Sequence, residues 1–324
     1  MTGSSGYALL PSGSSWLLLG TQDGWRTLAN RTPPAVPTDG GLAIAGAGHT
    51  IAVAVGPYDR LLASPVLSSQ APAGDWTPVE LPAGLADSRH ALALDGTVVT
   101  AIVTGAGGRL LRRSGNGWVS LVTAIDLAPA GQLSLDSISW AAGGRGWLTG
   151  HGRSGTAVAF TSKDDGRTWM VVSDLPRDAV AALTPCGNSN GWQLPVLSSD
   201  GSVRVLRSAD GATGWQLGAP IQTADQPSWT CADHTSWLLG VVSGANHLFI
   251  STDSGASWFD RGAVPSGLTD LSASSATNGF AAGQDGHSGL LWSVSIGGPG
   301  AKVGFSRLKL PSWIASLGRS HGSS

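Results

Sequence analysis

The feature that most constrains this chain is a repeat of short apolar segments, each opened by a small residue and an aromatic one. Clear copies begin at Gly146-Trp147, Gly191-Trp192, Ser236-Trp237 and Gly279-Phe280. Successive aromatic residues in this series are 45, 45 and 43 positions apart. A period of roughly 40–50 residues is typical of folds built from repeated units that bury their apolar faces against one another.

Three further copies lie nearer the N-terminus, beginning at Gly6-Tyr7 and, more weakly, near Ile51 and Thr97. Seven copies of about 46 residues account for the whole chain of 324 residues. We therefore expect one domain over residues 1–324, with no room for a second.

Each copy carries four short strand signals bounded by turn residues. The fourth copy is the clearest, with strands expected at Ser134–Trp140, Trp147–Gly150, Thr156–Ser162 and Trp169–Ser173. The 47 glycines follow no fixed period, which fits many tight turns, and long helical patterns are absent. These observations predict an all-β, seven-bladed β-propeller with four-stranded antiparallel blades and no helical connections.

The two ends of the chain are expected to close the ring. The first copy begins at its second strand, so its innermost strand is missing. A strand signal after the last copy, Trp313–Leu317, is expected to pair beside Tyr7–Leu10 and so remove an open sheet edge. The expected boundaries are 6–34 plus 312–318 for the first blade, and about 40–311 for blades two to seven.

The turn between the third and fourth strands carries the most specific motif, S-x-D-x-G-x-[ST]-W. An Asp side chain accepts hydrogen bonds from turn N–H groups, Gly supplies a positive φ, and Trp buries its ring beneath the turn. Complete copies comprise Ser162, Asp164, Gly166 and Trp169, and Ser251, Asp253, Gly255 and Trp258. Partial copies keep Ser208, Asp210 and Trp215, or Asp23 with Leu28 in the Trp position.

This motif is the Asp-box, or BNR repeat, and the chain resembles the Asp-box propeller family. That resemblance implies a structural role for the motif. The family includes sortilin-type receptors and photosystem II assembly propellers, which bind without catalysing, and also sialidases. A sialidase needs an arginine triad, a Tyr/Glu pair and an Asp acid, but the glutamate is Glu80 alone and the tyrosines are Tyr7 and Tyr58. We assign no catalytic residue.

The loops that join second to third strands, and fourth to first strands, share the face opposite the Asp-boxes. Because surface loops on a rigid scaffold commonly carry binding residues, this loop face is the expected binding surface. Its candidate residues are Tyr58, Asp59, Arg60, His151, Arg153, Arg177, Asp178, His247, Asp260, Arg261, Asp285 and His287. No cofactor or metal site is indicated.

Two classes of function follow from this reading. The first is a non-catalytic recognition scaffold that binds a protein or glycan partner on the loop face. The second is a glycoside hydrolase with an unrecognised carboxylate pair, and a lectin-like sugar binder is a further alternative. A formal net charge of −2 and the lack of a basic stripe make nucleic acid an unexpected partner.

Cys186 and Cys231 each lie six residues before Trp192 and Trp237, at the same position of adjacent repeats. They are either two independent buried residues or a disulfide, which would imply an oxidising compartment. No apolar run is long enough to span a bilayer, and small polar residues flank both ends of the chain. We expect a monomeric extracytoplasmic protein, secreted or anchored through an upstream segment, with a cytoplasmic location as the alternative.

Overall fold

The computed structural model describes residues 6–12, 15–32, 40–47, 50–57, 66–69, 77–79, 90–95, 98–103, 105–106, 108–114, 117–127, 133–141, 144–188, 191–223, 227–232, 235–286, 288–297 and 301–311. Contacts group the chain into two compact units. The terminal unit comprises Met1–Pro34, Asn188–Asn190 and Gly218–Ser324. The central unit comprises Ala35–Gly187 and Gly191–Leu217.

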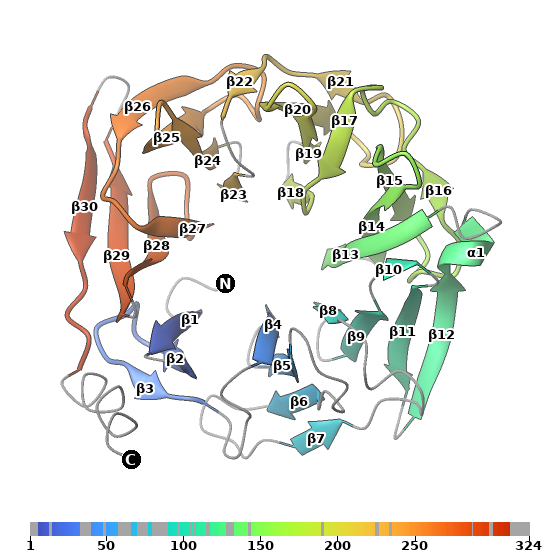
Figure 1. The fold of residues 1–324 in the computed structure, drawn as a ribbon, viewed down its shortest axis with the longest axis horizontal. Coiled ribbons are helices and arrows are strands. Elements are labelled where there is room, and N and C mark those ends of the chain that lie inside the picture. The colour runs from blue at the N-terminus through green and yellow to red at the C-terminus, as the bar shows by residue number, and fades with distance from the viewer. Residues whose placement is uncertain are drawn as a thin grey trace. The chain divides into compact units, whose positions relative to one another are not determined.

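The central unit consists of antiparallel sheets in which four main strands lie side by side (Figure 1). Two of these sheets are β4 (Gly40–Ala47), β5 (Thr50–Pro57), β6 (Val66–Ser69) and β7 (Thr77–Val79), and β8 (His90–Asp95), β9 (Val98–Val103), β11 (Arg109–Ser114) and β12 (Gly117–Thr123). The others are β13 (Leu133–Ala141), β14 (Arg145–Gly152), β15 (Ala157–Ser162) and β16 (Met170–Val171), and β17 (Ala179–Ala182), β19 (Gly191–Ser198), β20 (Ser202–Ser208) and β21 (Gln216–Leu217).

Three short elements supplement these sheets. The strand β10 (Gly105–Ala106) pairs with β13, and β18 (Cys186–Asn188) pairs with β19. One turn of helix, α1 (Ala124–Leu127), follows β12. The expectation that helical connections are absent is therefore wrong at this point. Asp126 explains the local turn, because its carboxylate accepts hydrogen bonds from the amide and hydroxyl of Thr123, both at 2.8 Å.

The terminal unit repeats the same pattern. One sheet contains β23 (Ser228–Ala232), β24 (Thr235–Val242), β25 (Ala245–Ser251) and β26 (Phe259–Ala263), and β22 (Ile221–Gln222) precedes it. Another contains β27 (Leu268–Ala273), β28 (Asn278–Asp285), β29 (Ser288–Ile296) and β30 (Val303–Arg307). It continues into β1 (Gly6–Ser12), β2 (Ser15–Thr21) and β3 (Ala29–Asn30).

The strand pairing confirms the predicted four-stranded antiparallel repeat. In each clear copy the aromatic residue lies in the second strand, as the spacing predicts: Trp147 in β14, Trp192 in β19, Trp237 in β24 and Phe280 in β28. The strands of the fourth copy also lie where they are expected, within a few residues at each end.

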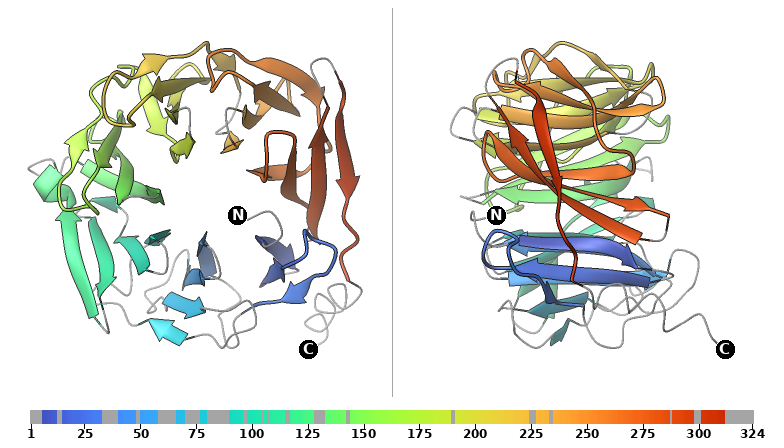
Figure 2. Two further views of the ribbon diagram at one scale, coloured as in Figure 1. Left: turned by 180° about the vertical axis from the view of Figure 1, so that it is seen from behind. Right: turned by 90° about the vertical axis from the view of Figure 1, so that its left-hand side faces the viewer.

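Among the described residues, the first copy contributes β1, β2 and β3, which match the second, third and fourth strands of the other copies because its aspartate turn joins β2 to β3. β1 pairs with β2 along its full length, from Gly6↔Thr21 to Ser12↔Ser15, and the hairpin is seen in dark blue in Figure 2. On its other side β1 meets β29 at the pair Ser12↔Ser288. The predicted closing strand, Trp313–Leu317, lies outside the described residues, so that closure and the predicted blade boundaries stay predictions.

The core lies between successive sheets. In the central unit, Leu110 and Val122 of one sheet pack with Leu133, Leu148 and Phe160 of the next. The side chains of Trp147 and Trp237 are 1% and 0% exposed. Because the β13–β16 sheet packs on a neighbouring sheet through each of its faces, its central strands carry apolar residues on both sides, and simple alternation is lost.

Candidate functional site

The turns between third and fourth strands form closed hydrogen-bond networks around an aspartate. Asp164 accepts from the Ser162 hydroxyl at 2.8 Å, and from the amide and hydroxyl of Thr168 at 2.9 and 2.7 Å. The Gly166 amide donates to the Ser162 hydroxyl at 2.9 Å, and the Trp169 indole donates to the Gly166 carbonyl at 3.0 Å. Gly166 has φ 79°, which favours glycine.

The second complete copy of the motif repeats this network. Asp253 accepts from the hydroxyl of Ser251 at 2.8 Å, and from the amide and hydroxyl of Ser257 at 2.9 and 2.6 Å. The amide of Gly255 donates to the Ser251 hydroxyl at 2.7 Å. The turn thus holds its carboxylate in the same way in both units.

The partial copies hold their carboxylates in a similar way but depart from the complete copies at several positions. Asp23 accepts from the Thr27 amide and hydroxyl at 2.9 and 2.7 Å, while Trp25 occupies the glycine position with φ 69°. Trp25 compensates for this rare backbone conformation by packing on Phe280, with ring centroids 5.3 Å apart. At Asp210 the partner residue is Thr213, three residues after the aspartate and not four as in the complete copies. Its amide donates to the Asp210 carboxylate at 2.9 Å.

These donors stabilise the charged form of each carboxylate. The Thr27 amide and hydroxyl lower the pKa of Asp23 to about 2. The same groups of Thr168 lower the pKa of Asp164, and the amides of Thr213 and Ala212 lower the pKa of Asp210. Partial burial works in the opposite direction at Asp253, but the hydroxyl and amide of Ser257 still hold its pKa below the usual value. Carboxylates held in this way suit a structural role better than acid–base chemistry.

The same turns also contact the preceding sheet of the central unit. The Arg112 guanidinium donates to the Asp165 carbonyl at 3.4 Å, and that of Arg145 donates to the Asp210 carbonyl. The Asp210 carboxylate pairs with Lys163 at 3.0 Å. This end of the strands is therefore engaged in joining one sheet to the next.

The opposite ends of the strands carry the candidate binding residues. In an antiparallel sheet, the turn joining second to third strands lies at the end opposite the turn joining third to fourth. Arg153 follows β14, and Arg177 and Asp178 precede β17, so all three lie at this end within the central unit. In the terminal unit, His247 and Asp285 lie beside the corresponding β24–β25 and β28–β29 turns.

In the central unit, His151 Nδ1 lies 3.0 Å from a carboxylate oxygen of Asp136. Both side chains are about half exposed. Asp136 is the extra residue of a β-bulge, because β13 pairs Leu135 with Gly150 and Ser137 with Thr149. Sequence reasoning missed Asp136, since a bulge changes the side to which a residue points without leaving a clear signal in the pattern.

In the terminal unit, His247 Nδ1 lies 2.9 Å from a carboxylate oxygen of Asp260, so the structure brings two predicted residues together. Asp260 also accepts from the Gly262 amide at 2.7 Å. The Arg261 guanidinium lies 6.0 Å from the ring of Phe259, an exposed aromatic residue. Polar and aromatic groups are therefore close together on the edge strand β26, within Phe259–Gly262.

The remaining candidates are isolated or engaged in local structure. The backbone carbonyl of Asp178 accepts from the Ser199 amide at 2.9 Å, and Asp174, a further acid in the same loop between β16 and β17, accepts from the Trp215 amide at 3.2 Å. Asp285 ends β28 in an exposed turn. Tyr58, Asp59, Arg60 and His287 lie outside the described residues.

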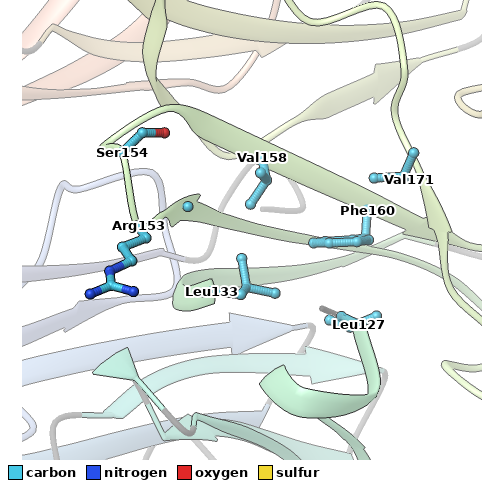
Figure 3. A pocket seen from close by; sticks show the side chains of 8 residues that line it. Leu127, Leu133, Arg153, Ser154, Val158, Phe160 and Val171 are labelled. Atoms are coloured by element: carbon cyan, nitrogen blue, oxygen red, sulfur yellow. The ribbon is translucent and has the colours of Figure 1, made fainter. Parts of the chain in front are cut away.

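An apolar groove about 620 Å³ in volume opens at the same end of the central unit, beside β14 and β15. Figure 3 shows Arg153 and Ser154 at one end of this groove, Leu127 and Val171 at the other, and Leu133, Val158 and Phe160 between them. Gly152 completes the lining, and we call this feature the Arg153 groove. Arg153 makes no ion pair within the described part of the chain.

Other site types receive no support from the described residues. They contain no group of three His, Cys, Asp or Glu side chains able to hold a metal ion. None of the helices in the described ranges is long and apolar enough to cross a membrane. Cys186 in β18 and Cys231 in β23 are both disulfide-bonded.

No protein-family model matches the sequence, and no curated protein matches it. Solved structures do match. YCF48 bound to D1 peptide is 17% identical with a TM-score of 0.63, covering 93% of this chain and 94% of that one. The GH74 xyloglucanase from Xanthomonas campestris is 16% identical with a TM-score of 0.69, covering 94% of this chain but 52% of that one.

The SapL1 lectin in complex with alpha methyl fucoside also matches, at 13% identity and a TM-score of 0.51, covering 82% of this chain and 98% of that one. These similarities, together with the four-stranded antiparallel sheets, show that the fold is a β-propeller. They include a peptide-bound protein, a lectin and a glycoside hydrolase, so likeness of fold leaves the function open.

Proposed function

We propose that this protein is a non-catalytic recognition propeller of the Asp-box type, with seven blades. Its partner, a protein or a glycan, binds at the strand ends opposite the aspartate turns. The four turns centred on Asp23, Asp164, Asp210 and Asp253 support the Asp-box assignment, because each uses its carboxylate to hold the hairpin. The predicted seven-copy repeat supports the blade number.

The observation that carries the non-catalytic proposal is how the acids at the binding end are held. Asp136 is paired with His151, Asp260 with His247, and Asp174 with a backbone amide. A glycosidase needs two carboxyl groups that face one substrate from environments that separate their pKa values. Each of these three acids instead has its own local partner.

The structural neighbours supply precedents for both partner classes on this fold, since one carries a D1 peptide and another alpha methyl fucoside. The xyloglucanase is the precedent for the alternative, a glycoside hydrolase. We also propose an extracytoplasmic location, which the disulfide-bonded state of Cys186 and Cys231 supports, because such bonds persist in oxidising compartments.

The enzymatic alternative is tested with a panel of chromogenic glycosides that includes sialosides, xyloglucan and other β-glucans. We expect no turnover. Hydrolysis that disappears in two single Asp→Asn variants, at unchanged melting temperature, would instead identify a catalytic pair. The variants are Asp59→Asn, Asp174→Asn, Asp178→Asn, Asp260→Asn and Asp285→Asn.

The binding end is tested by screening peptide and glycan arrays with matched charge reversals. Arg177→Glu changes an exposed residue at the proposed binding end, and Arg167→Glu changes an exposed residue in an aspartate turn. We expect Arg177→Glu to weaken array binding and Arg167→Glu to leave it unchanged. The opposite result, or the absence of any ligand on both arrays, would contradict the proposal.

A further inference from the structure

The Arg153 groove has a lining that distinguishes between the two partner classes. Its walls are aliphatic, from Leu127, Leu133, Val158 and Val171, and its one aromatic side chain, Phe160, is 5% exposed. A sugar ring is usually held by an exposed aromatic face together with several hydrogen-bonding groups. Aliphatic walls instead favour the side chain of a peptide. The groove volume of about 620 Å³ is within the roughly 300–1,000 Å³ common for ligand pockets.

One wall of the groove leaves apolar surface open to solvent. Val171, which lines the groove from the short edge strand β16, is 57% exposed. Covering the Val171 side chain with an aliphatic group would remove apolar surface from water, which favours binding. This gives the groove an affinity for an apolar side chain.

The other end of the groove is positively charged. Arg153 stands on the exposed turn after β14 and makes no ion pair within the ranges that the structure describes. Asp136, an acid at the same end of this sheet, is paired with His151. A guanidinium offers two parallel N–H donors that fit a carboxylate. Because Arg153 lies on an open turn, the carboxylate can belong to a side chain within a continuing peptide.

We propose that the Arg153 groove binds a peptide segment in which large aliphatic side chains lie next to acidic ones. The aliphatic groups occupy the space between Leu133 and Val171, and the acidic group pairs with Arg153. This inference rests on the proposed recognition function and names the class of partner for one of its surfaces.

The probes are three short fluorescein-labelled peptides with an amidated C-terminus, carrying Leu-Leu-Glu-Glu, Leu-Leu-Lys-Lys or Ser-Ser-Glu-Glu between Gly-Ser flanks. Fluorescence anisotropy with the full chain should show binding of the first peptide at least tenfold tighter than the other two. Arg153→Glu should weaken the first peptide about tenfold and strengthen the second. Val171→Ser should weaken the first peptide and leave the preference for acid over base intact.

Two matched controls are available in the central unit. Arg167→Glu makes the same charge change on an aspartate turn, and Val180→Ser removes another exposed valine, 40% exposed, on β17. Neither should change the affinity for the first peptide. Because Arg153 and Val171 are both exposed, their variants are expected to fold, which circular dichroism and the melting temperature check.

The outcomes separate this inference from the function on which it rests. Peptide binding that is unchanged by both Arg153→Glu and Val171→Ser, or failure of all three peptides to bind, would overturn the groove assignment. If array binding still depends on Arg177, the proposed recognition function holds even when the groove assignment fails. A xyloglucan oligosaccharide that displaces the first peptide would contradict the choice of a peptide over a glycan.

Discussion

The indole N–H of Trp147 donates a hydrogen bond to the carbonyl oxygen of Gly211, 3.4 Å away, in the aspartate turn of the following sheet. Trp237 occupies the same repeat position, but its indole N–H is buried without an acceptor among the described residues. The sheet that follows Trp237 belongs to the copy whose sequence has lost the aspartate turn. The Trp237 ring lies instead against Gly279, where a Cβ atom would come within 2.5 Å of it.

This difference predicts unequal effects of the same substitution. Trp147→Phe and Trp237→Phe remove similar ring volume, but only the first also breaks a hydrogen bond, which is worth roughly 0.5–1.5 kcal/mol. We expect Trp147→Phe to lower the free energy of unfolding by about 1 kcal/mol more than Trp237→Phe does. Urea denaturation of both variants measures the difference, and equal losses would show that the hydrogen bond contributes nothing.

Removing the central carboxylate of a turn should destabilise the protein without affecting ligand binding. Asp164→Ala and Asp253→Ala leave turn amides and hydroxyls without their acceptor, so each should lower the melting temperature. Arg167→Ala, in the same turn as Asp164, serves as the control and should cost little. Loss of peptide or glycan binding at unchanged melting temperature would show that the turns have a direct role in recognition.

The lowered pKa values of the turn aspartates predict sensitivity to acid. Because the unfolded chain binds protons to these groups more readily, their contribution is present above pH 4 and is lost as the pH falls toward about 2, the pKa of Asp23. We expect the free energy of unfolding to fall across this range. The double variant Asp23→Asn/Asp164→Asn should show a shallower fall than Asp178→Asn, measured by guanidinium denaturation between pH 2 and 6.

The left-handed backbone in the turns predicts opposite effects of two substitutions at one site. Ser254 has φ 58°, immediately before Gly255 at φ 86°. Ser254→Gly should be neutral or stabilising by up to about 1 kcal/mol, because glycine adopts this φ without strain. Ser254→Val should destabilise by about 1–2 kcal/mol. Melting temperatures that change in the same direction for both variants would exclude backbone strain as the cause.

Much of the fold could be predicted because the repeat spacing and the turn motif are local signals. The fourth strand of the fourth copy shows where such signals stop. It was predicted at Trp169–Ser173 but is formed by Met170–Val171, because Trp169 turns its indole back to the Gly166 carbonyl. The helix α1 was missed because it is a single turn held by Asp126 and Thr123, too short to show a helical period.

The candidate site was less predictable than the fold. Loop residues could be assigned to the correct strand ends from topology alone, but their pairing depends on register. His151 was predicted without its partner Asp136, which a β-bulge displaces from the regular alternation. The Arg153 groove combines Leu127 of α1 with Phe160 of β15, residues whose proximity depends on the packing of two sheets.

The arginine contacts across sheets bear on how such a chain could be shortened, duplicated or circularly permuted. Arg112 and Arg145 each reach a carbonyl in the aspartate turn of the next sheet, at Asp165 and Asp210. A segment that keeps such a contact within itself therefore begins inside one sheet, at the arginine, and ends in the aspartate turn of the next sheet. A cut at the boundary before β13 or before β17 separates one arginine from its acceptor, and a cut in the exposed β14–β15 turn separates both, because Arg112 and Arg145 precede this turn and Asp165 and Asp210 follow it.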